Sequence, residues 1–416
     1  MVWFVVTLVL VVGLSTLCWT TIGVGRLVVR RVRWASVAAW DGTRWVASDV
    51  AILIAARNEE LVLPGTLRAA RRIVPPEQIF VVSDASTDHT AAIARAQGAR
   101  VMELVRNRGK AGAIVAGLKH FDLPGRFAIV MLLDADTHPA PDYLDSGLRL
   151  FNHQQVVAVA GRAMTLADSR TTGLAGRLLL AYRERTYVAV QTLHKFGQAA
   201  RLADAVTIVP GFASMYRTHI LSSVDIAAPG LAIEDYNMTF EIHAKRLGRV
   251  AFDPAAARAY TQDPDTLDEY VRQMRRWSLG FWQTIVRHRF RLRVFWAGLV
   301  VTAFEVLMSS VLLVVVVPLL LVVLLSGALA SVGLDPGGVL GDTGGLMPVG
   351  AVLLGVLVPD LVLTVYTAVV TRELRYLAYA PAFPALRVLD AVVCLGALRK
   401  ALVGSSDGVW RSPVRR

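Results

Sequence analysis

The chain has 416 residues, of which 55% are hydrophobic, a high fraction for an ordinary soluble protein, so membrane spans are expected. Lys and Arg number 44 against 32 Asp and Glu, which gives a formal net charge of +12. This balance suits an anionic membrane surface or phosphorylated substrates, and the lack of basic patches interleaved with aromatic residues argues against nucleic-acid binding. The two cysteines exclude a disulfide framework and a cysteine-ligated metal cluster.

Residues 1–25 are predicted to form a transmembrane helix, because the stretch 1–24 is apolar and uncharged and is long enough to cross a bilayer. Basic residues follow this stretch, in a predicted juxtamembrane linker over 26–48, whereas a cleaved signal peptide would carry them in front. The positive-inside rule then places the N-terminus outside and the next domain in the cytoplasm. We therefore expect a multi-pass protein of the plasma membrane that contacts its lipids.

Residues 49–267 have the pattern of an α/β domain with a mostly parallel sheet. Buried strands are predicted over 50–56, 79–82 and 127–133, where Val, Ile and Leu run almost without interruption. The stretches 66–74 and 90–97 between them suit crossover helices.

Polar side chains follow each of these three strands. Asn58 and Glu59 follow the first, Asp84 the second, and Asp134 and Asp136 the third. In an open parallel sheet, ligands bind beyond the carboxyl ends of the strands. Each group alone is as well explained by capping a helix as by binding, but capping does not explain all three together. The D-x-D spacing of the last pair can hold Mg²⁺ or Mn²⁺ and present the ion to a diphosphate.

Two other phosphate-binding patterns are missing from the sequence. The stretch 108–111 lacks the first glycine and the hydroxyl residue of a P-loop, and no G-x-G-x-x-G follows the first strand. This argues against a P-loop nucleotidase and against a dinucleotide-dependent oxidoreductase.

The C-terminal part alternates between amphipathic and apolar segments. Residues 268–293 are predicted as an amphipathic interfacial helix, with an ordinary surface helix as the alternative. Residues 294–371 are predicted to hold about two transmembrane helices, and 372–416 an interfacial or re-entrant segment and a basic tail. Within the apolar run, Glu305 either lines a path for a polar substrate or lies near the interface beside Arg293.

The order of short motifs along residues 49–283 resembles the family-2 glycosyltransferases, and in particular the membrane-integrated poly-N-acetylglucosamine, hyaluronan and cellulose synthases. No single motif decides, but their order before a membrane span is specific. They are N-E at 58–59, D-x-S-x-D at 84–88, G-K-A at 109–111, D-x-D at 134–136, G-x-x-x-x-[FY]-R at 211–217, E-D at 234–235 and Q-x-x-R-W at 273–277.

This resemblance implies a GT-A fold flanked by transmembrane and interfacial helices, and a metal-dependent, inverting reaction. It implies that Asp136 holds the Mg²⁺ or Mn²⁺ ion and that Asp235 is the general base for the acceptor hydroxyl. The donor would be bound by Asn58, Glu59, Asp84, Lys110 and Asp134. The acceptor and the diphosphate would be met by Glu234, Gln273, Arg276 and Trp277.

The last three of these residues lie at positions i, i+3 and i+4, so that one helix face presents them together. Arg276 can then bridge diphosphate oxygens, and Trp277 offers a flat face to a sugar. Without the other motifs, an interfacial tryptophan and an arginine reaching the headgroups would explain the same residues.

The resemblance predicts transfer from a UDP-sugar, with UDP-N-acetylglucosamine as the first choice, to a growing β-linked polysaccharide. The alternative is a non-processive transferase that adds one sugar to a lipid acceptor. Expected partners are therefore a UDP-sugar and a glycan or lipid acceptor, with accessory subunits or a homo-oligomer compatible with either, and no nucleic acid.

Overall fold

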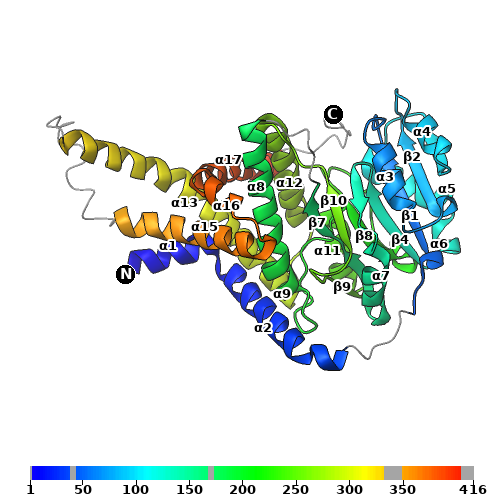
Figure 1. Ribbon diagram of the computed structural model, residues 1–416, viewed down its shortest axis with the longest axis horizontal. Helices are drawn as coiled ribbons and strands as arrows, with labels where there is room; N and C mark the ends of the chain where they lie inside the picture. The colour runs from blue at the N-terminus through cyan, green and yellow to red at the C-terminus, as the bar shows by residue number, and fades with distance from the viewer. Residues whose placement is uncertain (1, 38–43, 167–172, 332–348, 404–416) are drawn as a thin grey trace.

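The computed structural model describes residues 2–37, 44–166, 173–331 and 349–403 (Figure 1). It shows an α/β domain at one end and a group of long helices at the other. Helices α8 (Leu174–Ala189) and α12 (Leu267–Arg287) lie between these two parts (Figure 1).

The α/β domain is built on a seven-stranded sheet of order β3-β2-β1-β4-β8-β6-β9, in which β4 and β6 pair antiparallel with β8 and the other pairs are parallel. A three-stranded sheet of order β5-β10-β7 lies beside it. The predicted α/β class with a mostly parallel sheet is confirmed. The strands are β1 (Val50–Ala56), β2 (Ile79–Asp84), β3 (Arg100–Leu104), β4 (Ile129–Asp134), β5 (Thr137–Pro139), β6 (Val156–Ala160), β7 (Arg162–Thr165), β8 (Ala213–Arg217), β9 (Arg249–Ala251) and β10 (Arg258–Thr261).

The large sheet is buried on both faces. In β1, Ile52 and Ile54 pack in one apolar cluster with α3, while Leu53 packs in another with α5. This two-sided burial is the reason for the unbroken apolar runs of the central strands. The helices of the domain are α3 (Leu63–Ala70), α4 (Thr90–Ala96), α5 (Gly109–His120), α6 (Leu123–Arg126), α7 (Tyr143–Leu148), α8, α9 (Phe196–Gln198), α10 (Thr218–Leu221) and α11 (Asp235–Lys245), with a π-helical turn over Val190–Lys195.

The N-terminal apolar stretch is a bent pair of helices rather than one continuous helix. Helices α1 (Val2–Val12) and α2 (Leu14–Val37) meet at Gly13, whose φ is 86°, and the pair is bent by 71°. Glu305 of α13 accepts hydrogen bonds from the backbone N–H of Ser15, at 2.8 Å, and from its hydroxyl. Glu305 therefore caps the start of α2, a role that neither sequence-based interpretation contained. Helix α2 also extends to Val37, into the predicted linker.

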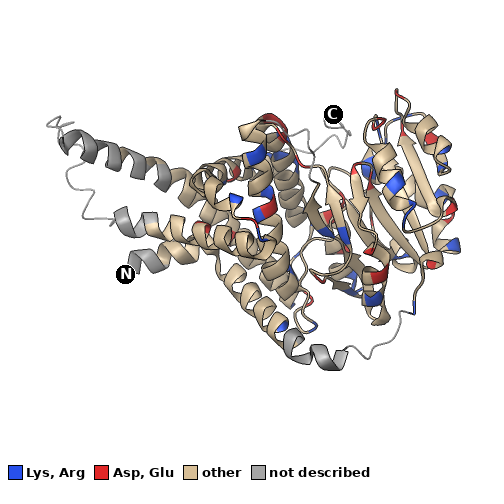
Figure 2. Cartoon of the chain, viewed as in Figure 1, with Lys and Arg blue, Asp and Glu red and all other residues tan. Residues whose placement is uncertain are grey.

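Within the described ranges, three helical stretches are long and apolar enough to cross a membrane: Val294–Val315, Leu354–Thr371 and Arg375–Val403. The bent pair at the N-terminus would make a fourth. Figure 2 shows that charged residues are sparse on this helical part and frequent on the α/β domain. The helices are α13 (Val294–Ser331), α15 (Val349–Thr371), α16 (Arg375–Tyr379) and α17 (Phe383–Val403).

The third of these stretches falls in the segment after residue 372 that is predicted to be interfacial or re-entrant, and its length and apolar composition would also suit a full span. Pro384 does not interrupt this stretch, because it is the second residue of α17, in the first helical turn, where a missing N–H costs nothing. The predicted basic tail over 410–416 lies outside the described residues.

Helix α12, predicted over 268–293 as an interfacial helix, ends at Arg287 and has its apolar face covered by protein. Thr266 caps its start through the N–H of Glu269. Leu279 and Trp282 are buried in one cluster with Ala397 of α17. The hydrophobic face that the sequence assigned to lipid thus packs against another helix.

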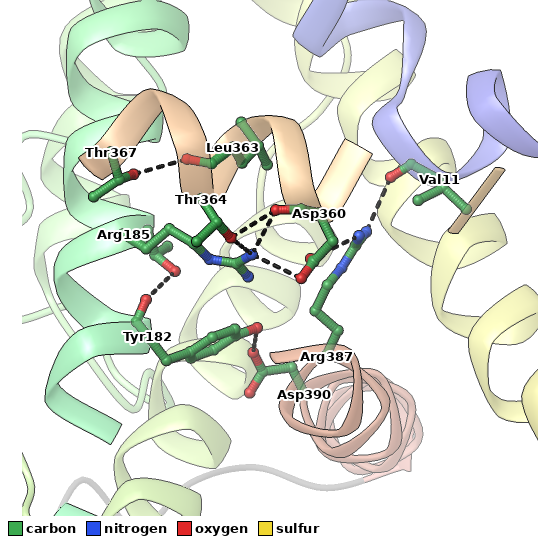
Figure 3. A network of polar contacts seen from close by, with 10 residues as sticks. Val11, Tyr182, Arg185, Asp360, Leu363, Thr364, Thr367, Arg387 and Asp390 are labelled. Carbon is green, nitrogen blue, oxygen red and sulfur yellow. Dashed lines mark hydrogen bonds and ion pairs between the residues drawn. The ribbon is translucent and has the colours of Figure 1, made fainter. Parts of the chain in front are cut away.

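A buried polar network joins the long helices to α8 (Figure 3). Asp360 of α15 pairs with Arg185 of α8 at 2.8 Å and with Arg387 of α17 at 3.3 Å. Arg387 also donates to the carbonyl oxygen of Val11 in α1, at 3.2 Å. This carboxylate thus joins three helices directly and a fourth through Arg387. Its loss would leave the buried guanidinium of Arg185 and the partly buried one of Arg387 without their anion.

We expect Asp360→Asn to destabilise the fold by about 3–5 kcal/mol, the usual cost of breaking a buried ion pair. The measurement is thermal unfolding of the detergent-solubilised protein. The matched control is Asp268→Asn, which removes an exposed i,i+4 pair with Arg272 and is expected to change the unfolding temperature little. Equal unfolding temperatures for the two variants would contradict this account of the network.

Candidate active site

The side chain of Lys110, in the first turn of α5, joins three segments at the carboxyl edge of the sheet. Its Nζ lies 2.6 Å from Asp134 Oδ1 at the end of β4, and 3.0 Å from Glu234 Oε1 just before α11. It also donates to the carbonyl oxygen of Gly211, at 3.2 Å. Residues far apart in the sequence are thereby brought to one place, and of the residues predicted at the strand ends this cluster contains Asp134.

Charges in this cluster are strongly coupled. Burial opposes the charged form of Lys110, but the carboxylates of Asp134 and Glu234 outweigh it and raise the pKa of the ammonium group. Burial also opposes ionisation of Glu234, yet the charge of Lys110 prevails and lowers the pKa of that carboxyl. For Asp134 burial prevails and raises the pKa, and the neighbouring charge of Asp136 adds to this rise. The cluster therefore holds a fixed cation between carboxylates of unequal acidity.

Asp235 begins α11 and is the carboxyl group in this cluster best matched to proton transfer near neutral pH. Burial, followed by the charge of Glu234, raises its pKa to about 6. Its oxygens accept from the N–H of Gly211 at 3.3 Å and of Tyr236 at 2.8 Å, so its orientation is fixed. A carboxylate with this pKa can accept a proton from a hydroxyl group and release it to water.

Asp136 lies in the turn between β4 and β5, two residues beyond Asp134. Its side chain accepts a hydrogen bond from the hydroxyl of Thr137 at 3.3 Å, and the turn is held by Thr66, which donates to the carbonyl oxygen of Ala135 at 2.7 Å. Among the described residues, no group of three or more His, Cys, Asp or Glu side chains could hold a metal ion by itself. This sparse carboxylate set fits Mg²⁺ or Mn²⁺, which protein sites bind through one or two carboxylates and the phosphates of a substrate.

Asp84 ends β2 and is fully buried. Its Oδ1 accepts from the N–H of Arg108 at 2.8 Å, which ties β2 to the loop that leads to Lys110. Its Oδ2 is buried and has no hydrogen-bond partner within the described part of the chain. Burial raises the pKa of this carboxyl. A buried acceptor without a donor is costly, so this oxygen is suited to an N–H group of a ligand.

Asn58 and Glu59 follow β1 and lie next to the loop after β2. The side-chain oxygen of Asn58 accepts from the N–H of Thr87 at 2.8 Å, and the N–H of Glu59 donates to the hydroxyl of Thr90 at 2.8 Å. Asn58 has a φ of 53°, a conformation that asparagine tolerates better than most residues. These two residues thus shape the loops around Asp84.

Gln273, Arg276 and Trp277 lie on α12, as predicted. Arg276 is exposed, and its charge contributes to the lowered pKa of Glu234. Gln273 and Trp277 instead contact Arg183 of α8: Arg183 Nη2 donates to Gln273 Oε1 at 2.9 Å, and the guanidinium carbon lies 4.3 Å from the centroid of the Trp277 ring. Arg276 therefore acts on the carboxylate cluster, whereas Gln273 and Trp277 contact α8.

Sequence reasoning gave no role to Gly211 or Arg183. Gly211 was noted only as the start of a motif, and the clue was its position in a loop that precedes a strand. For Arg183 the available signal was a row of charged residues, 183–185, inside a helix otherwise rich in Leu and Ala. Charged residues in such a setting are usually paired, but the sequence does not say with what.

A side chain at position 211 would push against the ends of two neighbouring side chains. A Cβ atom there would lie 2.9 Å from Lys110 Nζ and 3.0 Å from Glu234 Oε1. We expect Gly211→Ala to displace the ammonium group and to reduce turnover by roughly 100-fold, the effect of misplacing a functional group by about 1 Å. The control is Gly173→Ala, since no heavy atom lies within 4 Å of the added Cβ. Full activity of Gly211→Ala would contradict the contact geometry.

Comparison with known proteins identifies the family of the α/β domain. The family model described as "Glycosyltransferase like family 2" matches residues 47–280. The chain is 25% identical over 260 residues to the probable glycosyltransferase YdaM of Bacillus subtilis, an alignment that covers 59% of this chain and 58% of that protein. A mannosyltransferase from Pyrobaculum calidifontis, solved with GDP-Man and Mn²⁺, has a similar fold. Its TM-score is 0.53 at 17% identity, with 92% of this chain and 98% of that chain covered.

Proposed function

The chain belongs to the glycosyltransferase like family 2, and from this premise we propose that it transfers sugar from a UDP-sugar to a growing β-linked polysaccharide. UDP-N-acetylglucosamine is the first donor to test. The reaction takes place at the cytoplasmic face of the plasma membrane, in which the apolar helices anchor the enzyme. The observation that carries the proposal is the convergence of Asp134, Lys110, Glu234 and Asp235 at the carboxyl edge of the sheet.

In this proposal the donor lies across the carboxyl ends of β1, β2 and β4. The unpartnered oxygen of Asp84 accepts the imide N–H of uracil, within loops shaped by Asn58 and Glu59. Asp136 holds Mg²⁺ or Mn²⁺, and when bound the ion offsets charge that builds on the departing diphosphate. Lys110 fixes Asp134 beside the donor sugar, and Arg276 pairs with diphosphate oxygens through its guanidinium fork.

Asp235 is the proposed general base. Its carboxylate takes the proton from the acceptor hydroxyl while the hydroxyl oxygen forms a bond to C1 of the donor sugar. The bond between C1 and the diphosphate breaks at the same time, and UDP leaves with the electron pair. The acceptor attacks from the face opposite UDP, so the configuration at C1 is inverted. Glu234, beside Asp235, stays ionised because Lys110 lowers its pKa.

A second candidate is the addition of a single sugar to a lipid acceptor. It is favoured by a cavity of about 210 Å³ between α8, β7 and the end of α15, on the side of the domain that faces the long helices. Polar groups for a headgroup line it, among them Arg162, Glu184, Tyr187 and Glu373. A lipid held by α15 would bring its headgroup to this cavity.

The test is an incorporation assay with the purified protein in lipid nanodiscs. Labelled UDP-N-acetylglucosamine, UDP-glucose and GDP-mannose are supplied in turn with Mg²⁺ or Mn²⁺, the last donor because a mannosyltransferase of similar fold was solved with GDP-Man. We expect label from UDP-N-acetylglucosamine in a size ladder of glycan. A single glycolipid product would favour the second candidate, and no incorporation from any donor would overturn both.

A further inference from the structure

Consecutive side chains of helix α8 connect the Q-x-x-R-W motif of α12, at residues 273–277, to the apolar helices. Within residues 182–185, each member contacts a different segment. The contacts are Tyr182 to Asp390 of α17, Arg183 to Asp263 and to Gln273 of α12, Glu184 to Tyr376 of α16, and Arg185 to Asp360 of α15. Adjacent positions on a helix point about 100° apart, so these four side chains contact neighbouring segments around the whole circumference of α8.

Within this stretch, Arg183 is the residue that contacts Gln273 and Trp277 of the Q-x-x-R-W motif. It is 3% exposed, and its Nε lies 3.2 Å from Asp263 Oδ1. Its Nη2 donates to Gln273 Oε1 at 2.9 Å and to the hydroxyl of Tyr187 at 2.8 Å. The same guanidinium lies over the ring of Trp277, 4.3 Å from its centroid. One planar group therefore contacts both acceptor-side residues at once.

We propose that Arg183 is a positioning residue, which holds Gln273 and Trp277 in the orientation that binds the acceptor. This inference rests on the proposed function, because it assigns the acceptor side of the site to these two residues. Side chains of this length lose rotamer freedom on binding, and a contact that removes the freedom beforehand increases affinity. Arg183 does not touch the carboxylate cluster around Lys110 in any described contact, so its effect falls on the acceptor and not on the donor.

The position of Arg183 is itself fixed from two directions. Tyr187, one turn further along α8, donates to Asp263 Oδ1 at 2.9 Å and closes a ring of three hydrogen-bonded groups with Arg183. On the other side, the pair of Arg185 and Asp360 clamps α8 to α15 (Figure 3). Tyr182 and Tyr270 of α12 both donate to Asp390, at 2.9 and 2.7 Å, which fixes the spacing between α8 and α12. The arrangement of the apolar helices thereby sets where the acceptor-side residues lie.

The test compares Arg183→Lys with the wild type in steady-state transfer to β-linked N-acetylglucosamine oligosaccharides. Lysine keeps the charge beside Asp263 but cannot bond Gln273 and cover Trp277 as well. We expect the KM for the oligosaccharide to rise by about 10- to 100-fold, the effect of losing one hydrogen bond to a charged group. The KM for UDP-N-acetylglucosamine and the unfolding temperature are expected to change little.

Three further variants separate positioning from a purely structural role. Tyr187→Phe removes one hydroxyl from the ring of contacts and is expected to raise the same KM by a smaller factor. Thr186→Val, at an exposed neighbouring position, is the control and should behave as wild type. In a double-mutant cycle, the effects of Gln273→Ala and Arg183→Lys on this KM should be clearly less than additive, because both changes remove the contact between the two side chains.

The outcomes are distinguishable. An unchanged oligosaccharide KM in Arg183→Lys, or full additivity with Gln273→Ala, would overturn the positioning role. A fall in kcat and unfolding temperature with no change in KM would do the same, since it would indicate a structural ion pair only. If the wild-type enzyme transfers no sugar from any donor, it is the proposed function that fails.

Discussion

Asp136→Ala is expected to reduce sugar transfer by about 1,000-fold or more, since a metal ion supplies several kcal/mol at the departing diphosphate and each 1.36 kcal/mol is a factor of ten. The reason is that the site offers few metal ligands: no described cluster of side chains can replace Asp136 in binding the ion. Steady-state transfer at increasing Mn²⁺ measures the effect. We expect the variant to gain little from added Mn²⁺.

The matched control is Asp145→Ala, which removes an exposed carboxylate from α7, a few residues further along the chain. It is expected to keep wild-type activity and wild-type dependence on Mn²⁺. If Asp136→Ala turned over at the wild-type rate, the ion would not be bound at this turn and the proposed site would be wrong.

Asp235→Asn is expected to lower kcat by about 100- to 10,000-fold, the usual contribution of a general base. The wild-type enzyme should also show an acidic limb in its pH profile. Burial and the charge of Glu234 raise the pKa of Asp235 to about 6, and only the deprotonated form can accept a proton. Activity should therefore rise as the pH increases through about 6 and be lost below it.

The measurement is kcat/KM between about pH 5 and pH 8, where such a raised carboxyl pKa is seen. The residual activity of Asp235→Asn should lack the acidic limb. Glu241→Gln, on the same helix and paired with Lys245, makes the same chemical change outside the cluster and should keep the limb. An acidic limb that persists in Asp235→Asn would assign the titration to another group.

The fold of the α/β domain was largely predictable because its physical signals are local. A strand buried on both faces must be apolar throughout, so β1 could be delimited to the residue from sequence. The edge strand β3 has exposed residues and carries Arg100 and Glu103, and nothing in its pattern marked it as a strand. The small β5-β10-β7 sheet has short strands that pair across nearly a hundred residues or more, which no local pattern reveals.

The candidate site, like the fold, was predictable from the sequence only in part. The residues after the strands were predictable, because the carboxyl ends of parallel strands meet at one edge. The central position of Lys110 between Asp134 and Glu234 was not, since it depends on how far α11 lies from β4. The role of Glu305 depends on a helix break at Gly13, a residue nearly three hundred positions away. The sequence placed Glu305 in an apolar run but did not identify its partner.

The most direct test of the account is an experimental structure of the protein with UDP and Mn²⁺, with the ion located by its anomalous scattering. We expect the ion beside the carboxylate of Asp136, the diphosphate next to it, and the uracil ring at Asp84. An ion and nucleotide bound away from the carboxyl ends of β2 and β4 would contradict it.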